Sequence, residues 1–139
     1  MGNEIAPLPP LRAFQIFSEI PVGCTVHKEP ETRHEPHIHA GEMVVIDAND
    51  RSIELGELYL IAMSDGPNIW QVAKIPEKWL ILNPHLADCG YLRPLHSATY
   101  LPNGEIDWRR PVHMADGPIR LKRLQEYVVG RVIGLYAPN

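Results

Sequence analysis

The sequence predicts a mainly β protein, built as one strongly bent, antiparallel, barrel-like sheet. The apolar runs are short and rich in β-branched and aromatic residues. Several of them alternate apolar and polar positions with the period of two that a half-buried strand requires. Fourteen prolines and ten glycines divide the chain, so no amphipathic stretch is long enough to predict a helix. A chain of 139 residues can bury one substantial core, and we expect a single domain over residues 1–139.

Strands are expected where the apolar runs lie, and the turn signals between them predict how they pair. SDGPN has the composition of a turn, so the segment 59–75 is expected to form a hairpin. The last run, YVVGRVIGLY, is expected to close the sheet. The clearest strands are residues 43–47, 58–63, 69–75 and 127–136, and further apolar runs of strand character are AFQIF, WLILN and RLKRL.

Two segments depart from this strand pattern. Residues 1–20 are expected to form an N-terminal arm ahead of the sheet. Residues 85–118 are rich in proline and glycine and have strong β character only around ATYL, so they are expected to form an irregular insertion. Long irregular insertions in compact domains are often functional.

Charge and composition exclude several classes of function. The net charge is −4 and the pI is about 5.9, so we do not expect nucleic-acid binding, which normally requires a basic stripe. No basic region followed by an apolar run opens the chain, and no apolar run is long enough to span a membrane. We therefore expect a cytoplasmic protein without membrane contact, in which Cys24 and Cys89 are free thiols.

The stretch HEPHIHAGEMVVID, which begins at His34, carries the first candidate site. An H-x-H pair followed by glutamate is similar to the metal-binding motif of cupins, which are also β-barrels. His34, His37, His39 and Glu42 are the candidate ligands for zinc or another divalent metal. Cupins usually place three or four residues between the second histidine and the glutamate, whereas this chain has two. The other interpretation is a solvated, histidine-rich loop without a metal.

The order of the apolar runs also resembles a known family. AGEMVVID, GELYLIAM, IWQVAKI, WLILNPH and YVVGRVIGLY follow one another as in the C-terminal domain shared by LexA, UmuD and phage repressors. This domain has the fold of LexA-like and signal-peptidase-like Ser–Lys peptidases. The resemblance covers roughly residues 21–136 and implies that fold, with the atypical insertion at 85–118.

The catalytic pair of that family is replaced in this chain. An alignment on Gly41 places Arg33 at the serine position, and the hairpin strand places Ala73 at the position of the general-base lysine. Arginine stays protonated and accepts no hydrogen bond, so it cannot act as a nucleophile. Lys74 lies one residue further along, which in a strand means the opposite face. The resemblance therefore implies the scaffold without the peptidase activity, and we assign no catalytic residue.

These observations predict a catalytically inactive relative that acts as a binding or regulatory module, of phage or mobile-element origin. Its cleft would be lined by Arg33, His34, Pro36 and Ala73 and would accept an extended peptide by strand addition. We also expect a homodimer that pairs through the apolar run from Tyr127 to Tyr136, because an uncovered apolar edge strand is a liability. Two alternatives stay open. One is a metal-dependent enzyme or sensor, and the other is a self-cleaving peptidase with a displaced nucleophile.

Overall fold

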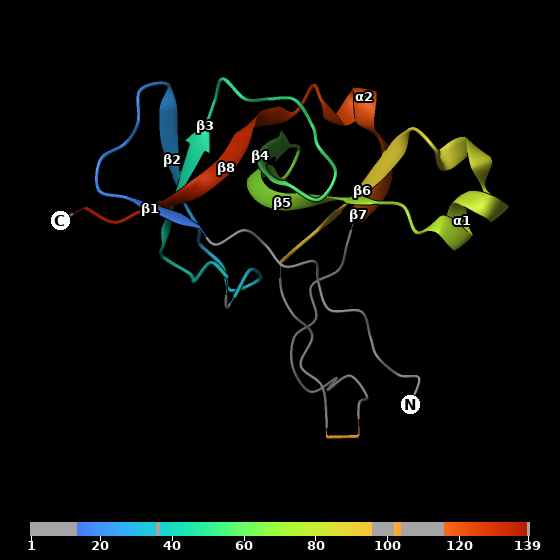
Figure 1. Cartoon of the computed structure of the whole chain (residues 1–139), viewed down its shortest axis with the longest axis horizontal. Helices are drawn as coiled ribbons and strands as arrows, with labels where there is room; N and C mark the ends of the chain where they lie inside the picture. The colour runs from blue at the N-terminus through green and yellow to red at the C-terminus, as the bar shows by residue number, and fades with distance from the viewer. Residues whose placement is uncertain (1–13, 36, 96–101, 104–115, 139) are drawn as a thin grey trace.

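The structure is a computed structural model that describes residues 14–35, 37–95, 102–103 and 116–138. Within these residues, the strands form one eight-stranded sheet, accompanied by two short α-helices and one turn of 3-10 helix (Figure 1). The elements in chain order are β1 (Gln15–Phe17), β2 (Cys24–Lys28), β3 (Met43–Asp47), β4 (Leu58–Met63), β5 (Gly66–Lys74), α1 (Glu77–Leu82), η1 (Pro84–Leu86), β6 (Cys89–Arg93), β7 (Asp116–Arg120), α2 (Leu121–Leu124) and β8 (Val128–Tyr136).

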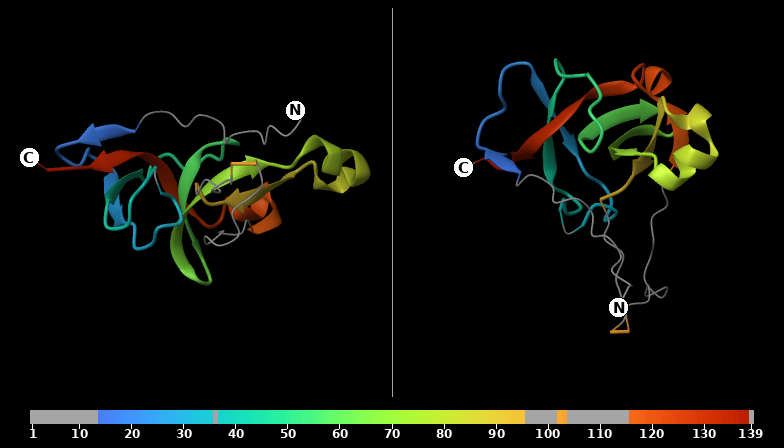
Figure 2. Two further views of the ribbon diagram at one scale, coloured as in Figure 1. Left: turned by 90° about the horizontal axis from the view of Figure 1, so that it is seen from below. Right: turned by 45° about the vertical axis from the view of Figure 1, so that its right-hand side comes forward.

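The sheet has the strand order β2-β3-β8-β4-β5-β6-β7, and β1 pairs in parallel with the end of β8. The other neighbours are antiparallel, and β4 and β5 form the expected hairpin. The prediction of a mainly β, antiparallel architecture is confirmed. The sheet does not close on itself, because β2 and β7 lie at its two ends. Figure 2 shows the β1–β2 end and α1 at opposite ends of the molecule.

β8 lies inside the sheet, between β3 and β4, so the prediction that it closes a barrel is wrong. It pairs with β3 along one edge and with β4 and β1 along the other. Register shifts opposite Val45 and Leu60 mark bulges in β8, and bulges bend a strand. The run from Tyr127 to Tyr136 therefore has no open edge over the stretch that pairs with these strands. The reason for expecting a dimer through this run is not met, and the homodimer itself stays a prediction.

The core lies on both sides of β4, whose side chains alternate between two clusters. Leu58 and Leu60 point into the first cluster, and Tyr59 and Ile61 point into the second. The first cluster also contains Ile38, Val44, Ile46, Ile69, Leu95 and Val132, and the second also contains Val72, Leu92, Leu124 and Val128. Both layers are therefore built on the same central strands.

Two apolar runs that the sequence predicts as strands are helices instead. WLILN lies mainly in α1, which follows Pro76, and a proline is well suited to precede a first helical turn because its φ is already fixed. Ile81 and Leu82 are exposed there, so the apolar run does not serve as a buried strand. RLKRL ends β7 and then forms α2, with only Leu124 buried. None of the helices in the described residues is long and apolar enough to cross a membrane.

The prediction of an irregular insertion at 85–118 is wrong for its first part. β6 falls within that range and pairs with β5, and β7 begins inside it and pairs with β6. Buried Cys89 and Leu92 anchor β6 to the core. The ATYL stretch lies outside the described residues. Similarly, the expected N-terminal arm contributes β1 to the sheet, while its first thirteen residues lie outside the described part of the chain.

Candidate functional site

The histidine loop, residues 29–42, joins β2 to β3 and carries most of the residues that the sequence singles out. Its ends are held together because the Glu29 N–H donates to the carbonyl oxygen of Glu42 at 2.9 Å. Within the loop, the Ile38 N–H donates to the carbonyl oxygen of His34 at 3.0 Å, and the Ile38 side chain is buried in the core. The loop is therefore folded against the sheet.

Arg33 ties the histidine loop to β5. Its side chain is only 9% exposed, and Nη2 donates to the carbonyl oxygen of Ile69 at 3.3 Å. The guanidinium carbon lies 4.4 Å from the centre of the Trp70 ring, a cation–π distance. β6 pairs with β5 only from Gln71 onward, so the Ile69 carbonyl lies just beyond the ladder between these two strands. Arg33 supplies a hydrogen bond for that carbonyl.

His34 links the same loop to the end of β6. The ring is fully buried, and Nδ1 accepts a hydrogen bond from the Leu95 N–H at 3.0 Å. An imidazole nitrogen that accepts carries no proton, so this contact assigns the neutral tautomer with its proton on Nε2. Nε2 lies 3.8 Å from Oε2 of Glu29. His34 thus holds the segment after β6 against the loop.

Two ionisable groups near Arg33 have shifted pKa values. Burial raises the pKa of Glu29, although the backbone N–H of Glu31 and the charge of Arg33 act in the opposite direction. Burial lowers the pKa of His27, and the positive charge of Arg33 lowers it further. Burial disfavours the charged form of both groups, which is why the carboxyl and the imidazole shift in opposite directions.

The four candidate metal ligands do not converge. His34 points into the interior, whereas His39 is 61% exposed and pairs with Glu42 on the surface at 3.0 Å. His37 lies between them and is half-buried. Among the described residues, no three His, Cys, Asp or Glu side chains are grouped so that they could hold a metal ion. The metal site stays a prediction without support from this arrangement, and Pro36 lies outside the described residues.

The two positions at which the resemblance implies a replaced Ser–Lys pair are apart. Ala73 lies on β5 opposite Tyr91, while the Arg33 guanidinium binds β5 at Ile69, four residues earlier. At about 3.3 Å per residue, this is roughly 13 Å along the strand. Lys74 is exposed, next to Ala73. The structure therefore brings Arg33 and His34 together in the histidine loop and leaves Ala73 in a different setting.

Ala73 lies in a trough that runs over one face of β5 and β6. The trough consists of two adjoining hollows of about 310 Å³ and about 360 Å³, and Tyr91 lines both. The first hollow is lined by Leu55, Gly56, Gln71, Ala73, Lys74, Tyr91 and Arg93. The second is lined by Ile75, Pro76, Trp79, Tyr91, Asp116, Gly117 and Pro118. We call the first the polar hollow and the second the aromatic hollow.

One wall of the polar hollow is held by hydrogen bonds, and two polar groups in its lining have no partner among the described residues. Gly56 N–H donates to the carbonyl oxygen of Val72 at 2.7 Å, and Gln71 Nε2 donates to the carbonyl oxygen of Gly56 at 2.9 Å. This orientation leaves Oε1 of the buried Gln71 side chain without a hydrogen-bond partner among the described residues. Arg93, opposite Gln71 in the register, is half-buried and forms no ion pair with any residue in the described part of the chain.

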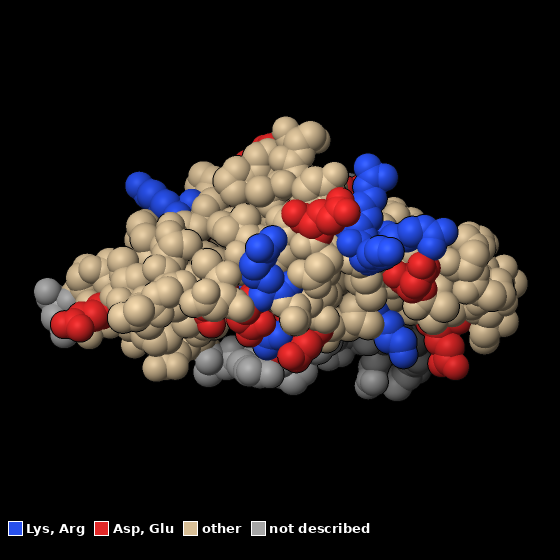
Figure 3. Space-filling view, turned by 90° about the horizontal axis from the view of Figure 1, so that it is seen from above, with Lys and Arg blue, Asp and Glu red and all other residues tan. Residues whose placement is uncertain are grey.

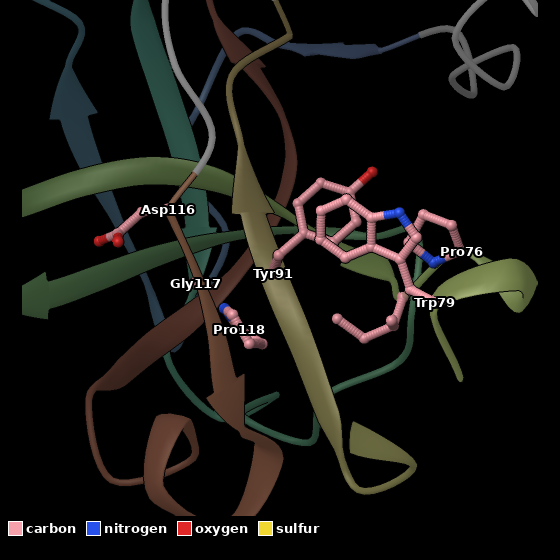
Figure 4. A pocket seen from close by; sticks show the side chains of 7 residues that line it. Pro76, Trp79, Tyr91, Asp116, Gly117 and Pro118 are labelled. Atoms are coloured by element: carbon pink, nitrogen blue, oxygen red, sulfur yellow. The ribbon is translucent and has the colours of Figure 1, made fainter. Parts of the chain in front are cut away.

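The aromatic hollow lies between α1 and β7. Figure 4 shows the rings of Trp79 and Tyr91 next to each other, while the Asp116 carboxylate points away from them. Trp79 is 51% exposed, and Ile81 and Leu82 on the same helix are also exposed. An exposed group of large apolar side chains beside a hollow is typical of a binding surface.

A third hollow, of about 770 Å³, lies on the other side of β7 and is more open. Its lining includes Met63, Ser64, Arg120, Arg123 and Tyr127. Figure 3 shows lysine and arginine side chains gathered on this upper face, where α2 lies, with acidic side chains between them. Arg120 already pairs with Asp88 at 2.6 Å. The charge of this face is therefore mixed, which does not favour a polyanion.

Both cysteines are free, as the sequence predicts. Burial and then the nearby charge of Asp47 raise the pKa of the Cys24 thiol, and burial and then Asp88 raise the pKa of the Cys89 thiol. A raised pKa keeps a thiol protonated, so neither cysteine has the environment of an activated nucleophile.

The sequence pattern places Ala73 in a cleft but does not single out Gln71, Tyr91 or Arg93. The last two lie in the range interpreted as an irregular insertion, so their position on a strand was not expected. One signal was present, because Gln71 is the polar residue on an otherwise apolar face of IWQVAKI. A buried glutamine needs hydrogen-bond partners, so it marks a place where polar groups gather.

No family model, no curated protein and no solved structure matches this chain. The family resemblance of the sequence stays a prediction.

Proposed function

We propose that this chain is a non-catalytic binding module and that its trough holds an extended peptide of a partner protein. One observation carries the proposal. The polar and aromatic hollows meet at Tyr91, beside Ala73, whose small side chain leaves space above the floor of the sheet. A concave surface with apolar walls and a few convergent polar groups is the usual form of a binding site.

The dimensions of the trough suit a short stretch of extended chain. Its floor follows the end of β5 and the next residue, from Gln71 to Ile75, five residues whose four steps span roughly 13 Å. An extended peptide rises by a similar distance per residue, so about five residues would lie along the floor. The floor belongs to a paired sheet and the wall at Gly56 is hydrogen-bonded, so little ordering is needed when a peptide binds.

The position of Arg33 supports the non-catalytic part of the proposal. The guanidinium is engaged with Ile69 and Trp70 and cannot act as a nucleophile. Ala73 supplies no base. A scaffold of the LexA-like peptidase type belongs to the proposal as well, supported by the order of β3, the β4–β5 hairpin and β8. In this proposal, the module regulates or assembles its partner by binding it.

The binding test uses one variant that fills the trough and one matched control. Peptides are selected from a random displayed library on the full chain, and their dissociation constants are measured by calorimetry. We expect Ala73→Leu to weaken binding by about tenfold or more, because its side chain occupies the polar hollow. Ala62→Leu, at an exposed position of β4, adds the same atoms outside the trough and is expected to change binding less than about twofold.

Amide chemical-shift mapping of the unmodified chain provides the second readout. A selected peptide should shift the signals of Gln71, Tyr91 and Arg93. If the library yields no binder, or if the selected peptides shift signals elsewhere and bind Ala73→Leu normally, the proposal is overturned.

The absence of catalysis has its own test. The purified chain, incubated at alkaline pH for days, should keep its mass when it is followed by mass spectrometry. Cleavage between Pro21 and Cys24 that is lost when a serine or cysteine is substituted would show a self-cleaving peptidase instead.

A further inference from the structure

We infer that the peptide in the trough carries an acidic residue and a large apolar residue four positions apart, both facing the sheet. This inference rests on the proposed function and adds the chemical class of the ligand. It follows from three features of the trough: the charge at one end, the aromatic surface at the other end, and the distance between them.

The polar hollow has the groups to bind a carboxylate. Arg93 lines it, is half-buried and forms no ion pair with another described residue. Arginine binds a carboxylate through two parallel hydrogen bonds, and partial burial strengthens such a pair. Next to it, Oε1 of Gln71 is a buried acceptor without a donor among the described residues, and a peptide backbone N–H can supply one.

The aromatic hollow has the surface to bind a large apolar side chain. Ile75, Pro76, Trp79 and Pro118 provide apolar walls around Tyr91, and the Asp116 carboxylate points away from the rings. Trp79 is exposed in the unbound chain, so an apolar side chain that covers it removes apolar surface from water. A leucine or phenylalanine is of the size that this hollow accepts.

The spacing follows from the register of the sheet. Arg93 pairs with Gln71, and Ile75 lies four residues further along the chain, roughly 13 Å away. An extended peptide covers this distance in about four residues. Side chains alternate between the two faces of an extended chain, so residues four apart face the same side, whereas residues three or five apart face opposite sides.

The peptide is expected to lie over the face of β6 and not at the edge of β7. Pro118 has no backbone N–H, so it removes a donor from this end strand, as is common in strands that are protected from pairing. In the open hollow beyond β7, Arg120 is already paired with Asp88. The trough instead combines Arg93, which forms no ion pair with a described residue, with the aromatic surface of Trp79 and Tyr91.

The test uses labelled peptides of about ten residues, made of serine, threonine and glutamine, with one aspartate and one leucine. The spacing between these two is two, three, four or five positions, and each is made with either residue first, because the geometry does not fix the direction. We expect a spacing of four to bind about tenfold more tightly than three or five, measured by fluorescence anisotropy on the full chain. Equal affinity at all spacings would overturn the inference.

A charge exchange tests the acidic position. The Arg93→Glu variant should no longer bind the aspartate peptide. It should bind a peptide with lysine in place of the aspartate about tenfold more tightly than the unmodified chain does. Arg120→Glu, outside the trough, changes the net charge equally and should leave both affinities nearly unchanged. If Arg93→Glu and Arg120→Glu behave alike, the assigned carboxylate site is wrong. Should Arg93→Glu fail to fold, the spacing series on the unmodified chain decides the question.

The two proposals fail in different ways. Library peptides that bind Ala73→Leu weakly but lack an acidic and an apolar residue four positions apart would overturn this inference and keep the proposed function. A chain that binds no peptide at all would overturn both.

Discussion

Arg33 is a packing contact in the structure, at the position where the sequence resemblance implies a catalytic serine. In the resemblance it replaces a nucleophile, and in the structure it lies against Trp70 and binds the carbonyl oxygen of Ile69. Its function here is to fix the histidine loop against β5. The side chain occupies space near the edge of the strand where β6 no longer pairs.

The stability that Arg33 provides can be measured. Arg33→Met keeps a similar aliphatic stem but removes the cation–π contact and the hydrogen bond to Ile69, so we expect a loss of about 1–3 kcal/mol in the free energy of unfolding. The measurement is urea denaturation. Arg120→Met breaks an exposed ion pair and is expected to cost less than about 1 kcal/mol. Equal losses in the two variants would contradict the role of Arg33.

The raised pKa of Glu29 predicts that the free energy of unfolding decreases as the pH rises. Burial raises its pKa above the ordinary 4.5, so the unfolded chain releases this proton at a lower pH than the folded chain does. Its contribution is complete below about pH 4.5 and is lost as the pH rises through the folded-state pKa. Glu29→Gln should remove this part of the decline, measured by denaturation between pH 4 and 8. An unchanged pH profile would show that the burial of Glu29 has no such effect.

The lowered pKa of His27 predicts that the free energy of unfolding decreases as the pH falls. Burial and then Arg33 lower its pKa below the ordinary 6.5, so the unfolded chain binds this proton first as the pH falls. Its contribution is present above about pH 6.5 and is lost as the pH falls towards the folded-state pKa. His27→Gln should therefore lose less stability than the unmodified chain between pH 7 and 5. A steeper decline in the variant would contradict the prediction.

The sequence identified Arg33 and His34 as unusual residues but could not show what they contact. The hydrogen bond of Arg33 spans 36 residues and that of His34 spans 61. Such contacts depend on the packing of distant strands, and no local pattern reports them. Gln71 carried a local signal because it interrupts an apolar face.

At the level of the elements, the sequence predicted strands better than short helices. Strands β3 and β4 have the expected bounds, because alternation over five or six residues is enough to recognise a strand. α1 has six residues and α2 has four, fewer than the window in which helical periodicity becomes visible. Their apolar residues were therefore interpreted as strands. β6 is not predicted because its run, CGYLR, is short and lies in a segment rich in proline and glycine.

The close approach of β8 to β3 predicts that Gly130 cannot be replaced by a larger residue without a loss of stability. A Cβ at Gly130 would press against the carbonyl oxygen of Asp47 on β3, and backbone atoms cannot move aside as a flexible side chain can. Gly130→Ala is expected to lower the free energy of unfolding by roughly 3 kcal/mol or more. Gly41→Ala is the control: its φ of +90° costs about 1–2 kcal/mol, but the space around it is open. A smaller loss at Gly130 than at Gly41 would contradict the close approach.

For the whole molecule, the position of β8 decides which edges are available to a partner. β2 and β7 are the ends of the sheet, and Pro118 protects β7. The long apolar run at the C-terminal end is already paired inside the sheet. Its apolar character is explained by burial between the two core clusters, to which Val132 and Val128 belong.

The two clusters share β4, and this predicts that the described part of the chain unfolds as one unit. Alternate residues of a single strand serve both layers, so neither layer can lose its packing while the other keeps β4 in place. Far-ultraviolet circular dichroism follows the sheet. When Trp79 and Trp108 are replaced by phenylalanine, tryptophan fluorescence follows the surroundings of Trp70 beside the second cluster. We expect the two signals to give the same midpoint in urea.

Two substitutions, one in each layer, test this shared strand. Leu60→Ala removes atoms from the first cluster and Ile61→Ala from the second, and each is expected to lower the free energy of unfolding by about 2–5 kcal/mol. In both variants the circular dichroism and fluorescence transitions should still coincide. Both layers pack against β4, so a substitution in either layer destabilises both. Leu82→Ala, exposed on α1, should change the free energy of unfolding by less than about 0.5 kcal/mol. If Leu60→Ala lowers the circular dichroism midpoint and leaves the fluorescence midpoint where it was, the layers unfold separately and the sharing of β4 does not couple them.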